Sequence, residues 1–210
     1  TYLAVFNTTG NQNYTSYSVS LSRKISKAVL SQTLAAYPSS SFTYDGNAPT
    51  IQDTLNASLV PGNTLSFTLE NNSISILSES SSNEPFNFTA LPGKYAAAGT
   101  YSYSSAQASN ANYTVLSSPV LAVSISKAQP TLTLTSTPAE NYTQNGTSLV
   151  FHFSISSINN QLKGDFYING TLKNSSITTS GTYNASYLPN IFNAVFNTTG
   201  NQNYSSNSLS

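Results

Sequence analysis

The motif in this chain most able to carry chemistry is asparagine followed by any residue and then Ser or Thr. Thirteen of the 25 asparagines begin such a triplet, which is the acceptor for N-linked glycans on exposed segments of secreted proteins. They are Asn7, Asn13, Asn56, Asn71, Asn87, Asn112, Asn141, Asn145, Asn169, Asn174, Asn184, Asn197 and Asn203. Because 63 of the 210 residues are Ser or Thr, chance gives roughly 7 or 8 triplets. The excess predicts covalent glycans, and a merely polar surface is the alternative.

The residues that usually perform catalysis are few. His152 is the single histidine, and there is no cysteine. The alternation of Leu149, Phe151, Phe153 and Ile155 places His152 on the opposite, outward face of a predicted strand. The seven acids are scattered, without a glycosidase-like pair or a calcium loop: Asp45, Asp53, Glu70, Glu79, Glu84, Glu140 and Asp165. We therefore expect no enzymatic activity, no cofactor and no metal.

The charge content narrows the range of partners. Seven Lys plus Arg balance seven Asp plus Glu, and charged residues make up 7% of the chain, against about 25% in a typical globular protein. This balance leaves no basic surface for nucleic acid and no electrostatic attraction to anionic membranes. The sequence contains no uninterrupted apolar run long enough to cross a bilayer, so we expect no membrane span in this segment. Glycans would explain how so few charges keep the chain in solution.

The elements that position these residues are predicted to be strands. In residues 148–155 the large apolar side chains Leu149, Phe151, Phe153 and Ile155 fall on every second position, and residues 131–135 alternate between Thr and Leu. Asn169-Gly170 between residues 162–168 and residue 171 onward predicts a hairpin with a type I′ turn, and Asn71-Asn72 predicts a weaker one. Short strands that alternate with regularly spaced turn signals favour an all-β sandwich.

Internal repeats divide the chain. The segment Ala4 to Tyr14, AVFNTTGNQNY, recurs without change at Ala194 to Tyr204. A weaker repeat relates residues 25–46 to residues 125–146, with nine identities in 22 positions. We therefore expect residues 1–22 to be the last strands of a preceding repeat, residues 23–122 to form domain A, and residues 123–210 to form domain B.

The segment that precedes domain A, residues 1–22, is predicted to need a partner. A two-stranded piece is marginally stable in water and leaves its strand edges open. It also cannot bury Tyr2, Val5 and Phe6 by itself. We expect it to complete a sandwich of a neighbouring copy, either in one continuous polypeptide or by strand donation between subunits.

Three segments carry a family resemblance. Lys127 to Leu134, KAQPTLTL, resembles the opening of prokaryotic Ig-like repeat domains of the Big type. Phe42 to Gly46, FTYDG, is similar to a segment of the bacterial MBG-type module, and Ala194 to Ser205 resembles the final two strands of such domains. The resemblance implies tandem Ig-like β-sandwiches from a large bacterial or archaeal surface protein, where they act as stalk, spacer, adhesin or envelope layer.

The same resemblance implies one candidate cross-link. Some surface Ig-like domains form a Lys–Asn isopeptide bond beside an acid, and Lys127, Asn203 and Asp165 would take those parts here. The alternative, which the sequence favours, is that Lys127 extends its aliphatic stem along the rim of the sandwich and keeps its charge in water.

Together these observations predict a structural segment of an extracellular, glycosylated surface filament or stalk. Its partners would be copies of itself, joined head to tail in a linear polymer or tandem array. The first alternative is an adhesin or carbohydrate-binding surface module, and the second is a spacer attached to an enzyme.

Overall fold

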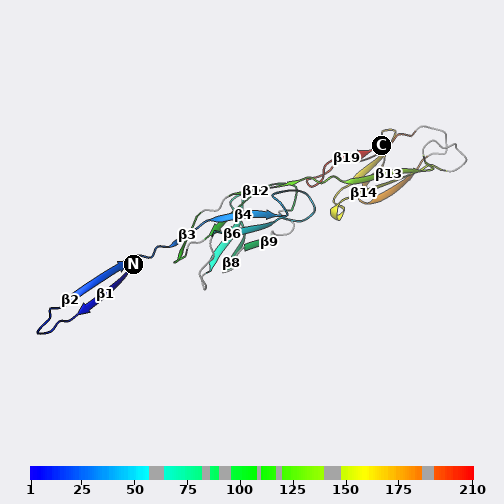
Figure 1. The fold of residues 1–210 in the computed structure, drawn as a ribbon. Coiled ribbons are helices and arrows are strands. Elements are labelled where there is room, and N and C mark those ends of the chain that lie inside the picture. The colour runs from blue at the N-terminus through cyan, green and yellow to red at the C-terminus, as the bar shows by residue number, and fades with distance from the viewer. Residues whose placement is uncertain are drawn as a thin grey trace.

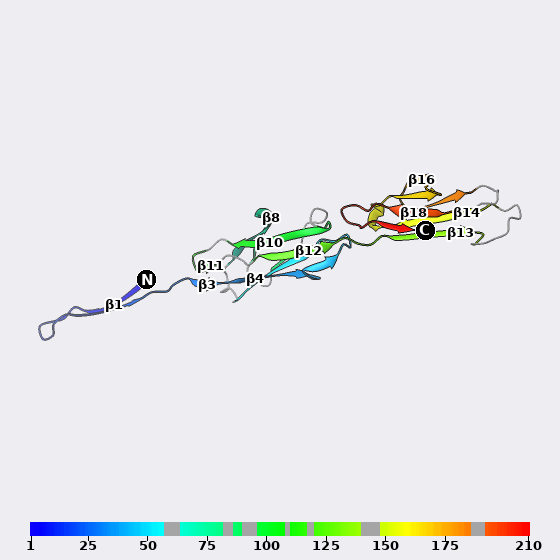
Figure 2. The same cartoon turned by 90° about the horizontal axis from the view of Figure 1, so that it is seen from above.

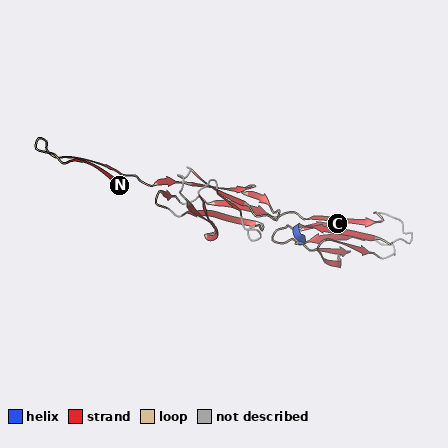
Figure 3. Ribbon diagram, turned by 90° about the horizontal axis from the view of Figure 1, so that it is seen from below, coloured by secondary structure: helices blue, strands red, loops and turns tan. Residues whose placement is uncertain are grey.

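The computed structural model describes residues 1–56, 64–81, 86–89, 96–107, 110–116, 120–139, 148–185 and 192–210. Strands account for nearly all regular structure in these residues, and the one helical element is a single 3₁₀ turn, Ile158–Asn160 (Figure 3). Val, Ile, Thr, Tyr and Phe, which suit a pleated and half-buried surface, supply the strands. The predicted all-β fold class is confirmed.

The chain extends along one long axis in three parts (Figures 1 and 2). The terminal hairpin consists of β1 (Tyr2–Thr8) and β2 (Tyr17–Arg23), which form a separate two-stranded sheet. The first unit contains β3 to β12, and the second unit contains β13 to β19. The hairpin projects from the end of the first unit that lies farther from the second unit.

The first unit is built mainly from a five-stranded sheet, in the order β5-β12-β10-β7-β8, and a three-stranded sheet, β4-β6-β9. A short parallel pair, β11-β3, lies at its N-terminal end. Large apolar side chains including Leu30, Ile51 and Phe67 fill its core. The strands are β3 (Ala28–Leu30), β4 (Gln32–Tyr37), β5 (Ser41–Thr43), β6 (Thr50–Leu55), β7 (Leu65–Asn71), β8 (Ile74–Ser81), β9 (Phe86–Thr89), β10 (Gly99–Gln107), β11 (Tyr113–Val115) and β12 (Leu121–Ser126).

The second unit pairs a three-stranded sheet, β13-β14-β17, with a four-stranded sheet, β16-β15-β18-β19. Its core is aromatic: the Phe153 ring lies 4.4 Å from that of Phe166 and 5.3 Å from that of Phe196, centroid to centroid. The strands are β13 (Thr131–Thr137), β14 (Val150–Ser156), β15 (Gly164–Ile168), β16 (Thr171–Ile177), β17 (Ser180–Asn184), β18 (Ala194–Thr198) and β19 (Asn207–Leu209).

Two glycines make room for these rings. A Cβ on Gly164 would lie 2.5 Å from Cζ of Phe196, closer than real Cβ contacts. A Cβ on Gly181 would overlap the Phe153 ring in the same way. Each ring therefore lies flat against bare backbone of the neighbouring strand.

The predicted hairpin turns are present, one of them shifted. Asn169 and Gly170 have φ of 47° and 75°, the positive pair that a type I′ turn needs, so this prediction is confirmed. In the first unit the positive φ values fall on Asn72 (49°) and Ser73 (63°), so the expected turn at Asn71-Asn72 is wrong by one residue. Asn71 instead belongs to β7, where it is buried and pairs with Ile74.

The expected boundary between residues 122 and 123 also needs correction. It would divide β12, which pairs with β10 from Leu121 to Ile125 and belongs to the five-stranded sheet of the first unit. Val123 is fully buried in the first core, whereas Ile125 packs against the core of the second unit. The first unit therefore runs to Ser126, and the strand that ends it also contacts the unit that follows.

Candidate functional site

The terminal hairpin exposes an unusual amount of apolar surface. Every residue of β1 and β2 is exposed, including Phe6 at 71% and Val5 at 50%. The repeat of this sequence in the second unit lies in a different environment, since Phe196, the counterpart of Phe6, is 0% exposed. The same local sequence is therefore a solvent-exposed hairpin at one end of the chain and a core element at the other.

The two hairpins share one pairing register. In the terminal hairpin Phe6 pairs with Val19 and Asn7 with Ser18. In the second unit the pairs are Phe196 with Leu209 and Asn197 with Ser208, which occupy the corresponding positions of the repeat. The terminal hairpin therefore already has the strand alignment that its repeat has inside the sandwich.

In the second unit, three groups bury this hairpin. β18 pairs with β15, so that Phe166 lies opposite Phe196. The Phe153 ring of β14 lies over Phe196 from the other sheet. Gly164 leaves the space that the Phe196 ring fills. A surface that buries Phe6 in the same way must therefore resemble the second unit without its last two strands.

The loop of the hairpin is stabilised by a side chain in all three places where Asn-x-Asn-Tyr occurs. The Oδ1 atom of Asn11 accepts hydrogen bonds from the backbone N–H groups of Asn13 and Tyr14, at 2.8 and 3.0 Å. Asn110 and Asn201 make the same two bonds to the residues two and three positions later. These Asx turns fix the loop locally, without help from a partner.

In the two sandwich units, the first residues of the unit hold its last turn. Lys27 Nζ donates to the carbonyl oxygen of Asn110, and Lys127 Nζ donates to that of Asn201, both at 2.7 Å. The next residue, Ala28 or Ala128, continues the contact through a backbone bond of 2.9 Å to Asn112 or Asn203. This contact, the closing clasp, brings the start and the end of each unit together in parallel.

The turn that ends the second unit also contacts the first unit. Tyr204 is buried, and its ring meets that of Tyr44 edge to face at 5.5 Å. The Tyr44 hydroxyl hydrogen-bonds with the amide of Gln161, and the Ala98 N–H donates to Oδ1 of Asn203 at 3.0 Å. The junction between the units is therefore packed and hydrogen-bonded.

The glycan acceptors fall into three groups. Exposed asparagines are Asn7, Asn13, Asn56, Asn112, Asn169 and Asn184, and half-buried ones are Asn174, Asn197 and Asn203. Asn71 is buried and its Oδ1 accepts from Ser102 N–H, so this acceptor does not lie on an exposed segment as the others in the first group do. The side chain of Asn87 and all of Asn141 and Asn145 lie outside the described residues.

The structure gives each member of the candidate isopeptide trio another partner. Lys127 is exposed and bonds the Asn201 carbonyl. Asn203 donates to Gln161 Oε1 at 3.1 Å, and Asp165 accepts from the N–H of Ser176 at 3.0 Å. Lys127 is thus an exposed lysine of the closing clasp, which is the alternative that the sequence favours over the cross-link.

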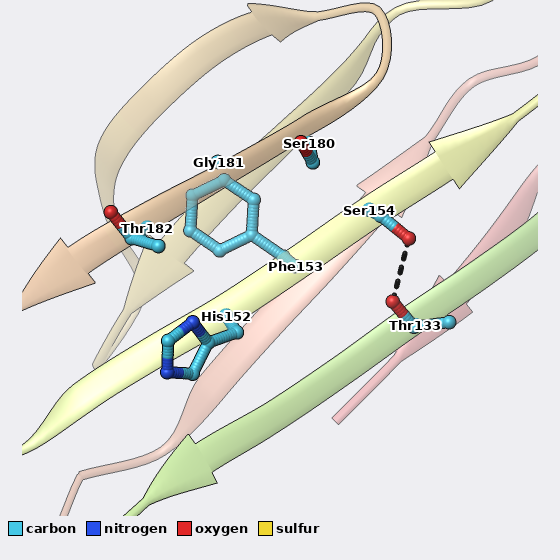
Figure 4. Close-up of a pocket in the computed structure, with 7 residues that line it drawn as sticks. All are labelled: Thr133, His152, Phe153, Ser154, Ser180, Gly181 and Thr182. Carbon is cyan, nitrogen blue, oxygen red and sulfur yellow. Dashed lines mark hydrogen bonds between the residues drawn. The ribbon is translucent and has the colours of Figure 1, made fainter.

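His152 lies on the outward face of β14, as the alternation predicts (Figure 4). It borders a shallow hollow together with Thr133, Phe153, Ser154, Ser180, Gly181 and Thr182. The hydroxyls of Thr133 and Ser154 hydrogen-bond each other at 2.7 Å. The lining residues offer hydroxyls and one imidazole but no carboxylate to orient a base, so this hollow lacks the third group of a hydrolytic triad.

Two kinds of site are absent from the described part of the chain. No three side chains of His, Asp or Glu come together there as metal ligands would. No helix in those ranges is long and apolar enough to cross a membrane.

The first unit contains a group of three buried polar side chains that the sequence alone does not reveal. Asp53, one of the acids that look scattered along the chain, is 0% exposed and lies in the core with Gln32 and Ser105. Gln32 Nε2 donates to Asp53 Oδ2 at 2.7 Å and to Ser105 Oγ at 3.3 Å. Burial raises the pKa of the Asp53 carboxyl, while hydrogen bonds from Ser105 and Gln32 partly lower it. These three residues form the buried polar cluster.

Comparison with known proteins gives only distant structural likenesses. No family model matches the chain, and no curated protein does. Among solved structures the chain is similar to the human OSCAR ligand-binding domain, with 15% identity, 85% of this chain and 97% of that chain covered, and a TM-score of 0.34. It is also similar to the fibronectin(III)-like modules of CbhA from Clostridium thermocellum, with 14% identity, 84% and 91% covered, and a TM-score of 0.29. The strand topology of the two units itself defines the class, an all-β protein of sandwich type.

Proposed function

We propose that this chain is a structural segment of an extracellular, glycosylated cell-surface filament or stalk built from tandem Ig-like units. In this proposal the terminal hairpin supplies the last two strands of a preceding unit of the second kind. The observation that carries the proposal is the contrast between Phe6 and Phe196, which share sequence and register but are 71% and 0% exposed.

The direction of the hairpin supports a linear arrangement. In the second unit the loop that contains Tyr204 faces the first unit, because Tyr204 packs on Tyr44. The loop of the terminal hairpin points away from the first unit (Figure 1). A preceding unit completed by this hairpin would therefore have the same polarity as the second unit. Repeating that contact gives a head-to-tail array that does not close on itself.

The gain from such docking is sizeable. Full burial of a Phe side chain is worth about 1.5–3 kcal/mol, and Phe6 would move from water into a core as Phe196 has done. Tyr14 is 75% exposed, and its repeat Tyr204 is buried at 3%. In the array, Tyr14 would meet the counterpart of Tyr44 from another first unit and form the same junction.

A continuous polypeptide accounts for these contacts better than exchange between separate chains. The acceptor surface of the second unit is already filled by its own β18 and β19. Donation of the terminal hairpin to another copy of this chain would have to displace those strands. In a continuous array each acceptor is followed directly by its own hairpin, so nothing has to be displaced.

Glycans fit this architecture on the outer faces of the units. Asn56 and Asn112 are exposed on the first unit, and Asn169 and Asn184 are exposed on the second. Asn13 is exposed here, but its repeat Asn203 is bonded into the junction through both side-chain atoms. We therefore place the glycans at Asn56, Asn112, Asn169 and Asn184, and exclude Asn13 and Asn203 in the assembled array.

The test supplies the terminal hairpin with a surface on which it can dock. Residues 127–190 are placed directly before Thr1, because the repeat makes Thr1 the counterpart of Ile191. The added segment and the terminal hairpin should form a third folded unit, and the amide hydrogens of β1 should become protected from exchange. The matched control carries Phe6→Asp in the same extended chain and should leave the added segment unfolded. Equally fast exchange of β1 with and without the added segment would overturn the proposal.

A further inference from the structure

The buried polar cluster joins the two sheets of the first unit. Gln32 is on β4 and Asp53 on β6, which are neighbours in the three-stranded sheet. Ser105 is on β10 of the five-stranded sheet. All three side chains are buried, at 6%, 0% and 3% exposure. The contacts of 2.7 and 3.3 Å from Gln32 Nε2 therefore cross the interior of the sandwich.

The second unit shows that the fold does not need polar groups here. Leu34 pairs with Asp53 as Leu134 pairs with Phe153, which makes Asp53 and Phe153 equivalent. By the same alignment Gln32 corresponds to Leu132.

Ser105 corresponds to Phe196. Ser105 lies opposite Leu69 of β7, and Phe196 lies opposite Phe166 of β15. Leu69 and Phe166 occupy matching positions, because each stands three residues before the asparagine of the hairpin turn that ends its strand. Ser105 and Phe196 also each precede the asparagine of their Asx turn by five positions. One unit therefore has Leu, Phe and Phe where the other has Gln, Asp and Ser.

Two oxygen atoms of the buried polar cluster have no hydrogen-bond donor within the described residues. Asp53 Oδ1 and Gln32 Oε1 are both buried acceptors, and among the described residues neither has a hydrogen-bond donor. A proton on the Asp53 carboxyl would serve both oxygens, and burial favours that neutral form. The core then contains a hydroxyl, a primary amide and a neutral carboxylic acid in mutual contact, shielded from water.

We propose that this cluster forms an intramolecular ester bond between Ser105 and Gln32. The Ser105 oxygen attacks Cδ of Gln32, and Asp53 gives its proton to the amide oxygen while its other oxygen accepts the proton of the hydroxyl. The intermediate then collapses: the C–N bond breaks, Asp53 gives the nitrogen the proton with which it leaves as ammonia, and the hydroxyl on Cδ passes its proton to Asp53 as the ester carbonyl forms. The amide and the hydroxyl become an ester plus ammonia, and Asp53 ends in its starting form.

The burial of all three side chains favours this outcome over hydrolysis, because solvent has little access to them. The Ser105 hydroxyl contacts the amide nitrogen of Gln32 at 3.3 Å in the folded unit, so the attack on the adjacent Cδ is intramolecular. The product links β4 to β10, that is, the two sheets of the sandwich. This inference does not depend on the proposed assembly, because both residues belong to one unit.

Intact-mass measurement of the glycan-free full chain tests it directly. The cross-linked chain should be lighter than its sequence by about 17 Da, the mass of one ammonia. Trypsin cuts after Lys27, Lys94 and Lys127, which places Gln32 and Ser105 on different peptides. The expected result is one joined species containing residues 28–94 and 95–127, which hydroxylamine separates.

Variants distinguish the ester from other causes of the same decrease in mass. Ser105→Ala and Asp53→Asn should restore the full mass, whereas Ser104→Ala, one position away on β10, should leave the loss unchanged. The native chain is measured first, so its mass alone supports or overturns the proposal even where a variant fails to fold. A native chain at full sequence mass overturns the proposal. So does a loss confined to a single peptide, as a succinimide at an Asn-Gly step would give.

Discussion

The paired phenylalanines Phe6 and Phe196 provide the sharpest test of the structure. They lie in identical copies of one sequence segment, so local propensity and unfolded-state effects are nearly the same for both. Phe196 is fully buried against Phe153, and Phe6 is 71% exposed. Truncating a buried Phe to Ala costs about 3–5 kcal/mol, because contacts are lost and a cavity remains. Truncating an exposed one changes stability by about 0.5 kcal/mol or less.

Thermal and urea unfolding of the two variants should therefore separate widely. For a domain of this size, about 1 kcal/mol moves Tm by about 4–8 °C, so Phe196→Ala should lower the Tm of the second unit by more than about 10 °C. Phe6→Ala should leave both unfolding transitions in place. Circular dichroism follows the loss of strand structure, and Phe196→Leu gives a milder variant in case the alanine variant does not fold.

The extended chain with residues 127–190 before Thr1 supplies the second half of the test. There Phe6 should be buried, and Phe6→Ala should now cost about 3–5 kcal/mol in the added unit. If Phe6→Ala and Phe196→Ala destabilise the original chain equally, the terminal hairpin must pack against the first or the second unit of the same chain. A Phe6→Ala variant that remains harmless in the extended chain would refute the docking argument.

Three other predictions follow from the burial of single side chains. Because the pKa of Asp53 is raised in the folded state, the first unit should lose stability as pH rises from about 4, the ordinary Asp value, and Asp53→Asn should remove that slope in urea titrations. Glycopeptide mapping of native material should find occupancy at Asn169 but none at Asn71, and an intact mass above 22.3 kDa; a native mass equal to the sequence mass would contradict glycosylation. Tyr44→Ser should loosen the junction between the two units, so that small-angle scattering shows a broader distribution of end-to-end lengths of the molecule while both units stay folded. An unchanged distribution would show that Tyr44 does not hold the two units in a fixed orientation.

The sequence predicted the features that depend on neighbours along the chain. Asn169-Gly170 specifies its own turn, because both residues adopt positive φ readily, and the period-two spacing of Phe151, Phe153 and Ile155 assigns the faces of β14. The repeat of AVFNTTGNQNY was sufficient to predict that residues 1–22 form a pair of strands. These features need no information about residues far away in the chain.

The features that the sequence did not predict depend on contacts between distant strands. Gln32, Asp53 and Ser105 lie far apart along the chain, and each looks like an ordinary polar residue in its own strand. Alternation gives Asp53 the parity of an inward residue, but only the packing of β4 and β6 against β10 brings the three together. The alignment of Asp53 with Phe153 was the available signal, since a carboxyl at a core position calls for an explanation.

The closing clasp has a mechanical consequence. The strands at the start and the end of the first unit, β3 and β11, run parallel, and Lys27 bonds the turn beside them. When a chain of such units is stretched from its ends, the two strands are pulled in opposite directions along their length. Their hydrogen bonds then carry the load together in shear, instead of opening one after another like a zipper. A rod assembled from these units would resist tension at the points where each unit is entered and left.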